Sequence, residues 1–202
     1  MLNLLLILIV GAILLLTIFF IYRYSSQQPQ VPVNSIGVRS PVTSKPYQVQ
    51  DLPNSQEAAN MLATVDQRIE ILRSYLEKNI NQYPHFRPYI QQFLTRIKGV
   101  RLVENPPDGK YTSFTVNKGE EIALCLRSTD TGELHDINLV MYVVLHELAH
   151  VACPEIDHTP LFKEIFVFFL NIAIKLGIYS KVNYKAHPEK YCGLTINENL
   201  LG

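Results

Sequence analysis

The N-terminus of the chain is one continuous apolar run. No charged residue occurs between Met1 and Tyr22, and residues 4–21 are almost entirely Leu, Ile, Val and Phe. Because about 20 helical residues span the roughly 30 Å hydrocarbon core of a bilayer, we expect residues 1–24 to form a transmembrane anchor that meets lipid through residues 4–22. A cleaved signal peptide is the alternative, but such peptides begin with positive charge and have an apolar stretch of only about 7–15 residues.

The next segment, residues 25–53, has no sustained apolar period. It contains five prolines and many Ser and Gln residues. This composition is typical of an extended connection, so we interpret the segment as a Pro/Ser/Gln-rich linker between the anchor and a folded domain.

Helical periodicity begins at residue 54. An apolar stripe at three- and four-residue spacing predicts a long helix within residues 54–79, and Asn54 with Glu57 resembles a capping box at its start. A shorter helix is predicted over residues 87–99, where Gly99 ends the pattern. Neither helix carries a reactive side chain, so both are expected to be scaffold.

Alternating apolar and polar positions then predict strands within residues 99–105, 110–117 and 120–127, separated by the turns PPDG and KG. Two strongly apolar helices follow, one from Ile137 to Val151 with Asp136 as its N-cap, and one that begins after Thr159 and Pro160. These elements predict an α+β fold over residues 54–202, a single domain with helices around a small antiparallel sheet.

The charge balance gives little indication of binding partners. The formal net charge is zero, with 18 Lys and Arg against 18 Asp and Glu, so no basic surface for nucleic acid is indicated. Arg23, Arg39 and Lys45 follow the apolar run and no cation precedes it, which favours a single-pass protein whose domain lies on the cytoplasmic side of the membrane.

The cysteine pattern also favours the cytoplasmic side of the membrane. Cys125, Cys153 and Cys192 are odd in number and far apart, a pattern that fits reduced thiols in a reducing compartment. One disulfide plus a free thiol is the alternative.

The sequence HELAH lies at the end of the first apolar helix. His146 and His150 are four residues apart, so they point the same way and can place two imidazole nitrogens on one metal ion. Glu147 lies beside this pair, where it can accept a proton from an attacking water instead of binding the metal. The alternative is a pair of buried core histidines with hydrogen-bond partners.

A third ligand is expected at the start of the next helix. Pro154 forces a turn after HELAH, and the pair Thr159–Pro160 is typical of a helix start, which puts His158 at the mouth of the new helix. Three protein ligands leave a fourth position open, as in catalytic zinc sites. Asp157 and Glu155 are alternative third ligands.

The motifs HELAH and HTPLF resemble those of the WLM and SprT zinc metallopeptidases, whose pattern is HExxH, a spacer and HxxxF. The seven residues between His150 and His158 are more than in the WLM pattern and fewer than in the SprT pattern. The longer stretch LHDINLVMYVVLHELAHVACPEIDHTPLF, with YCGLTIN near the C-terminus, is most similar to short membrane-anchored WLM-like proteins of large nucleocytoplasmic DNA viruses. The resemblance covers residues 54–197.

The resemblance implies a zincin-like domain in a host or virion membrane, with His146, His150 and His158 as Zn²⁺ ligands and Glu147 as the catalytic acid and base. We therefore expect a membrane-anchored zinc metallopeptidase that acts on a protein or peptide. A structural virion membrane protein with a zinc site and a DNA–protein crosslink protease are the alternatives. The oxyanion-stabilising residue is left open among candidates in the C-terminal tail, namely Tyr179, Tyr184, Tyr191 and His187, and Cys153 is an alternative metal ligand.

Overall fold

The computed structural model describes residues 10–11, 13–19, 34–106 and 112–201. The chain divides into two compact units, residues 1–30 and 31–202, and each is described by itself. In the first unit, residues 10–11 and 13–19 are helical and most of their side chains are exposed. The remainder of the expected anchor and residues 25–33 of the expected linker lie outside the described residues. Within the described part of the chain, no helix combines the length and the apolarity needed to cross a membrane.

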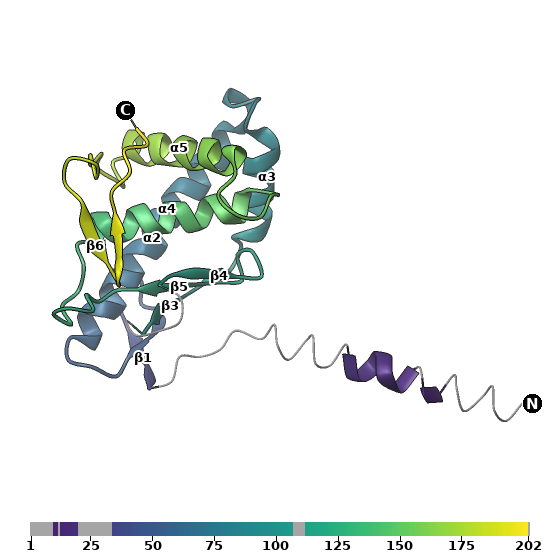
Figure 1. Cartoon of the computed structure of the whole chain (residues 1–202), viewed down its shortest axis with the longest axis horizontal. Coiled ribbons are helices and arrows are strands. Elements are labelled where there is room, and N and C mark those ends of the chain that lie inside the picture. Colours follow the sequence, from purple (N-terminus) through teal and green to yellow (C-terminus); the bar gives the residue numbers. More distant parts are fainter. Residues whose placement is uncertain (1–9, 12, 20–33, 107–111, 202) are drawn as a thin grey trace, which may run out of the picture. The chain divides into compact units, whose positions relative to one another are not determined.

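The second unit is built on a mixed sheet of five strands in the order β1-β2-β3-β5-β4 (Figure 1). The strands are β1 (Ser35–Arg39), β2 (Pro46–Gln50), β3 (Arg101–Asn105), β4 (Phe114–Val116) and β5 (Glu121–Cys125). β3 is parallel to both β2 and β5, whereas β1 with β2 and β4 with β5 are antiparallel. The α+β class is confirmed, but the prediction of an antiparallel sheet was wrong. β5 is buried along its whole length and takes an interior place beside β3, which moves β4 to the edge.

The folded domain also begins earlier than residue 54. Residues 35–50 form β1 and β2, so the interpretation of residues 25–53 as a linker was wrong for this part. A buried ion pair fixes the end of β2 to the sheet, because Glu104 accepts hydrogen bonds from Gln50 N and from Arg127 Nε, both at 2.8 Å. Arg127 also donates to the carbonyl of Pro53 at 3.0 Å. The segment before the first helix is therefore part of the core.

The helices match their predicted ranges. They are α2 (Ser55–Asn79), a short 3₁₀ turn (Ile80–Gln82), α3 (Arg87–Arg96), α4 (Ile137–Ala152) and α5 (Pro160–Lys175). Asp136 and Thr159 cap α4 and α5 by accepting from Asn138 N and Phe162 N, as predicted. Asn54 instead has a left-handed backbone, with φ of 64°, and makes no side-chain cap, so the expected capping box does not form.

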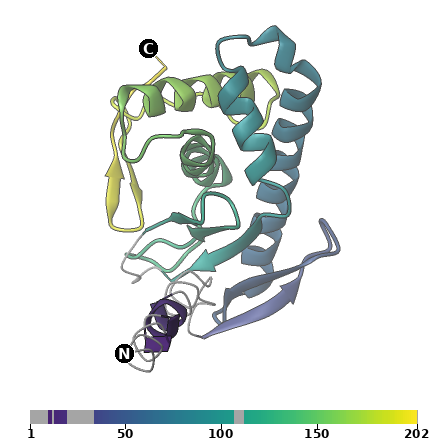
Figure 2. The same ribbon diagram turned by 90° about the vertical axis from the view of Figure 1, so that its right-hand side faces the viewer.

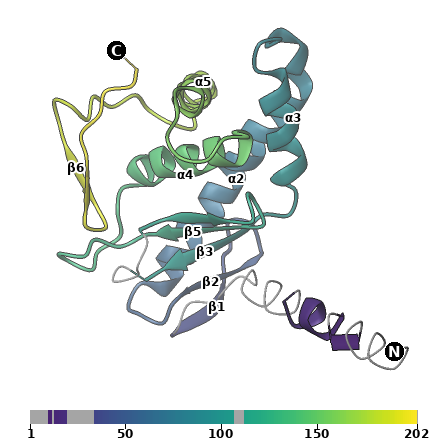
Figure 3. The ribbon, with the colours of Figure 1, turned by 45° about the vertical axis from the view of Figure 1, so that its right-hand side comes forward.

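α4 is the central element of the domain. Figure 2 shows it end-on, with the sheet below it, α5 above it, α2 and α3 on one side, and a C-terminal hairpin on the other. Figure 3 shows the same helix lying along β3 and β5. The hairpin consists of β6 (Glu189–Tyr191) and β7 (Leu194–Ile196). Of the 16 residues of α4, 12 are buried, which explains its nearly continuous apolar sequence.

Candidate metal centre

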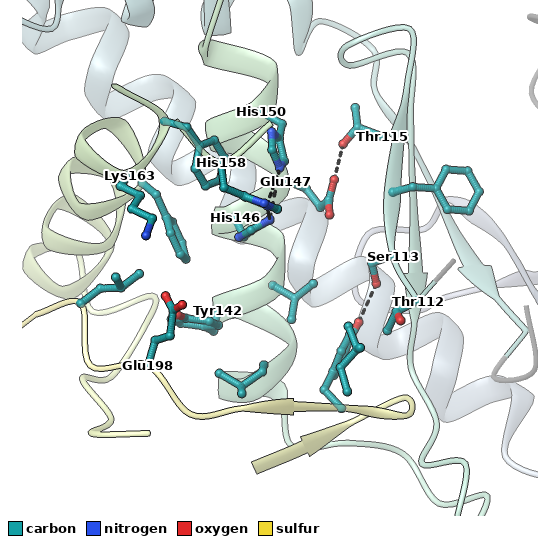
Figure 4. A pocket seen from close by; sticks show the side chains of 18 of the residues that line it. Thr112, Ser113, Thr115, Tyr142, His146, Glu147, His150, His158, Lys163 and Glu198 are labelled. Atoms are coloured by element: carbon teal, nitrogen blue, oxygen red, sulfur yellow. Dashed lines mark hydrogen bonds between the residues drawn. The ribbon is translucent and has the colours of Figure 1, made fainter. Parts of the chain in front are cut away.

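Three imidazole rings converge at the C-terminal end of α4 (Figure 4). The Nε2 atoms of His146 and His150 are 3.2 Å apart, and that of His158 is 2.9 Å from the first and 3.3 Å from the second. Two nitrogens bound to one tetrahedral zinc ion at about 2.05 Å each would be separated by about 3.3 Å. The three rings therefore present their nitrogens with nearly the spacing that a shared metal ion requires.

Helix geometry and one turn bring these rings together. His146 and His150 share a face of α4 because they are four residues apart. α4 ends at Cys153, whose backbone is extended with ψ of 130°, and the chain reverses through Pro154–His158 before α5 begins. Glu155 and Asp157 are exposed in this turn and are not part of the convergent group, so the structure brings together the three predicted histidines and neither acidic alternative.

Phe162 packs against all three histidines from the first turn of α5. Its ring stacks on His150 with centroids 4.1 Å apart, and its edge contacts with His146 and His158 are at 4.9 Å. Phe162 is only 2% exposed. A rigid aromatic ring in this place limits the rotation of each imidazole.

Burial keeps two of the rings neutral. It lowers the pKa of His146 to about 3 and that of His150 to about 4, and repulsion between the neighbouring histidines adds to the effect. A neutral imidazole has a nitrogen lone pair for a metal, so these two side chains are ready to bind one at neutral pH.

Glu147 points away from the histidines toward the sheet. Its Oε2 accepts a hydrogen bond of 2.8 Å from Thr115 Oγ1 on β4, and the side chain is 7% exposed. Burial raises the pKa of Glu147 to about 7, although the Thr115 hydrogen bond acts in the opposite direction. The sequence analysis did not identify Thr115 as a site residue, because its only distinguishing feature there is a position in a strand of alternating apolar and polar residues.

A pocket of about 840 Å³ opens beside the histidines and Glu147. Its walls come from β4, α4, α5 and the C-terminal segment. Lining residues outside the metal centre include Ser113, Thr115, Tyr142, Val143, Lys163, Phe166, Tyr191, Leu194, Ile196 and Glu198. Such a mostly apolar space with a few polar groups is typical of a substrate-binding cleft.

The other candidates are distributed differently. Of the four proposed oxyanion partners, Tyr191 lines the pocket, whereas Tyr179 and Tyr184 are buried beside Tyr142 and His187 is exposed elsewhere. β5 lies inside the sheet, so β4 and not β5 borders the pocket.

The cysteines do not match the prediction of reduced thiols. Cys125 and Cys192 form a disulfide between the end of β5 and the turn of the C-terminal hairpin, and Cys153 is a buried free thiol. The alternative of one disulfide with one free cysteine is therefore the one observed.

Similarity to known proteins indicates the family of the chain. Residues 43–162 match the model of the WLM domain family. An uncharacterized protein of Acanthamoeba polyphaga mimivirus is 62% identical over 81% of this chain and 83% of its own length. An uncharacterized protein of Invertebrate iridescent virus 6 is 38% identical over 46% of this chain and 49% of its own length.

A crystal structure of Wss1 from Saccharomyces cerevisiae is similar to 73% of this chain over 99% of its own length, with 23% identity and a TM-score of 0.45. The family match spans more than half of the chain, and the mimivirus relative covers most of it. The chain therefore belongs to the WLM family, a family of zinc metallopeptidases.

Proposed function

We propose that the chain is a zinc-dependent peptidase in which His146, His150 and His158 bind Zn²⁺ and Glu147 is the general base. The observation that carries this proposal is the convergence of three Nε2 atoms, all within 3.3 Å of one another, at a pocket that a buried carboxylate also lines. Three imidazoles suit zinc, and they leave a coordination position for water or substrate.

A bound zinc ion would supply Lewis acidity that acidifies water and polarises a peptide carbonyl. Residues of the chain itself carry out the proton transfers. Glu147, next to the ligand His146, takes the proton of the attacking water and returns it to the leaving amine. Its pKa of about 7 in the metal-free protein suits a group that both takes and gives a proton near neutral pH. Thr115 holds the carboxylate in position through its hydrogen bond.

A structural zinc site is the competing function. Structural sites commonly use four protein ligands, whereas the convergent group contains three within the part of the chain that the structure describes. A purely structural site also has no use for a buried carboxylate beside its ligands, and burial of Glu147, which has no charged partner among the described residues, costs stability. Both features favour a catalytic site.

We also propose that residues 4–22 anchor the protein in a membrane, because they form an uncharged apolar run of sufficient length. Which side of the membrane the domain faces is a separate question, on which the charges after the apolar run and the disulfide disagree. Arg39 ends β1 and Lys45 pairs with Asp66 at 2.9 Å, so both are part of the folded domain. The disulfide favours an oxidising environment for this domain and carries more weight than these charges.

The metal is tested on the full-length protein in detergent. We expect about one zinc per chain in the wild type, and its loss in the His150→Ala variant. His187→Ala is the matched control, because His187 is exposed outside the pocket lining. Equal zinc contents in both variants, or no zinc in the wild type, would contradict the proposal.

Catalysis is tested by the Glu147→Gln variant with a mixture of peptides as substrate. Loss of a general base lowers kcat by about 10²–10⁴-fold while zinc content is unchanged. Glu155→Gln removes an exposed acid from the neighbouring turn and is expected to leave activity intact. A wild-type protein that binds zinc and cleaves no peptide would support the structural alternative.

A further inference from the structure

The C-terminal hairpin and the residues after it form one wall of the pocket. This hairpin wall, residues 189–201, contributes Tyr191, Leu194, Thr195, Ile196, Asn197, Glu198 and Leu200 to the lining. Figure 4 shows it running along the pocket below the three histidines and Glu147. Leu194 is 59% exposed, so it is available to contact a bound peptide.

The hairpin pairs only with itself among the described residues. β6 and β7 form their own two-stranded sheet, separate from the five-stranded one. An isolated two-stranded hairpin is marginally stable in water. Its turn also has positive φ at Cys192 (47°) and Gly193 (82°), a conformation that glycine adopts readily and cysteine does not. The wall therefore depends on attachments to the rest of the domain.

Several attachments among the described residues hold it, and the disulfide between Cys192 and Cys125 is the only covalent one of them. The buried Tyr191 ring packs on His135 with centroids 5.0 Å apart, and Lys181 Nζ donates to the carbonyl of Leu201 at 3.0 Å. The Tyr191 and Ser113 hydroxyls are 2.8 Å apart, and Lys190 pairs with Asp130 at 2.8 Å. Both partners of that ion pair are mostly exposed, and such pairs contribute little.

We propose that the Cys125–Cys192 disulfide is a redox lock on the substrate cleft, holding the hairpin wall in place so that only the oxidised protein binds peptides well. This inference rests on the proposed peptidase function and adds its regulation. Reduction releases the wall, and the peptide loses the apolar surface that Leu194 and its neighbours provide. The metal centre stays intact, because its ligands and Glu147 lie on α4 and in the turn between α4 and α5.

The chemistry of the lock needs a dithiol reductant. One thiolate of the dithiol attacks Sγ of Cys192, which is 8% exposed, and Cys125, which is fully buried, leaves as the thiolate. The second thiol of the reductant then displaces Cys192 from the mixed disulfide. Two electrons and two protons pass to the protein, which gains two thiols while the reductant becomes a disulfide.

The test compares oxidised full-length protein with the same sample after treatment with a dithiol. We expect reduction to raise the KM for unstructured peptides at least ~10-fold, the effect of losing contact with about one Leu-sized side chain, with kcat and zinc content unchanged. The Cys125→Ser/Cys192→Ser variant should behave like the reduced protein and be insensitive to the reductant. Cys153→Ser, which keeps the disulfide, should behave like the wild type.

Two probes separate this proposal from the proposed function. A peptidyl hydroxamate should bind at least ~10-fold more weakly after reduction, whereas acetohydroxamate, which meets only the metal, should bind equally well in both states. Amide hydrogen exchange in residues 189–196 should accelerate on reduction even in a protein that shows no peptidase activity. Unchanged exchange there, an unchanged KM, or higher activity after reduction would each overturn the lock, whereas absence of zinc or cleavage in the oxidised protein would contradict the peptidase function alone.

Discussion

Replacement of Phe162 should separate the orientation of the metal ligands from the stability of the fold. Its ring contacts all three histidines, at 4.1 Å from His150 and 4.9 Å from the other two. Leucine fills most of its volume, so Phe162→Leu should lower the free energy of unfolding by only about 1 kcal/mol. Phe162→Ala should cost about 3 kcal/mol, near the lower end for such changes, because the cavity would open into the neighbouring pocket and admit water.

The loss of zinc affinity in these variants should be larger than their loss of folding stability explains. Residues that orient metal ligands typically change metal affinity by 10–100-fold, and we expect about a ten-fold loss for Phe162→Leu. The assay pairs urea unfolding in the presence of a chelator with zinc titration against a competing chromophoric chelator. Phe93→Leu is the matched control, because Phe93 is fully buried against Phe169 in the α3–α5 region and contacts no histidine. Equal zinc affinities in the two leucine variants would refute an orienting role for Phe162.

The remaining predictions concern charge. Between pH 6.5 and about 4, unfolded chains protonate His146 and His150 while the metal-free native protein does not, so its stability should fall as the pH falls through this range. The raised pKa of Glu147 has the opposite effect on stability, because the native state retains that proton up to about pH 7. Glu147→Gln should therefore make the free energy of unfolding, measured with urea, decline more steeply as the pH falls. An unaltered slope would contradict this. Glu104→Gln should lower the free energy of unfolding by about 3 kcal/mol or more, because it leaves Arg127 buried without its counter-charge, and adding Arg127→Met should recover part of that loss.

Local signals predicted the helical part of the fold. The Asp136 and Thr159 caps and the turn at Pro154 involve residues within a few positions of one another, so sequence spacing was enough to place His158 beside the HELAH histidines. The ligand set could be predicted for the same reason, because two ligands share one helix face and the third follows one turn later.

Strands β3, β4 and β5 and the antiparallel pairing of β4 with β5 match the prediction. The strand order and the parallel pairings could not be predicted, because they join strands that are not neighbours in sequence. β2 pairs with β3 across α2 and α3, and its short alternation of Tyr47 and Val49 lies in a proline-rich segment that indicates a linker. The contact of Thr115 with Glu147 and the pairing of Cys125 with Cys192, which are 67 residues apart, depend on that topology. Cysteine spacing alone does not specify such a pairing.

The disulfide also determines what a cut in the chain would do. It closes residues 125–192 into a covalent ring, and the exposed turn Pro154–His158, where Ile156 is 77% exposed, lies inside that ring. Exposed turns are preferred sites of proteolytic nicking, and a peptidase sample subjects its own molecules to cleavage. A single cut in this turn would leave both fragments joined through sulfur, so the nicked protein would run as one full-length band on a gel without reductant. Self-digestion at this turn would therefore become visible only on reducing gels.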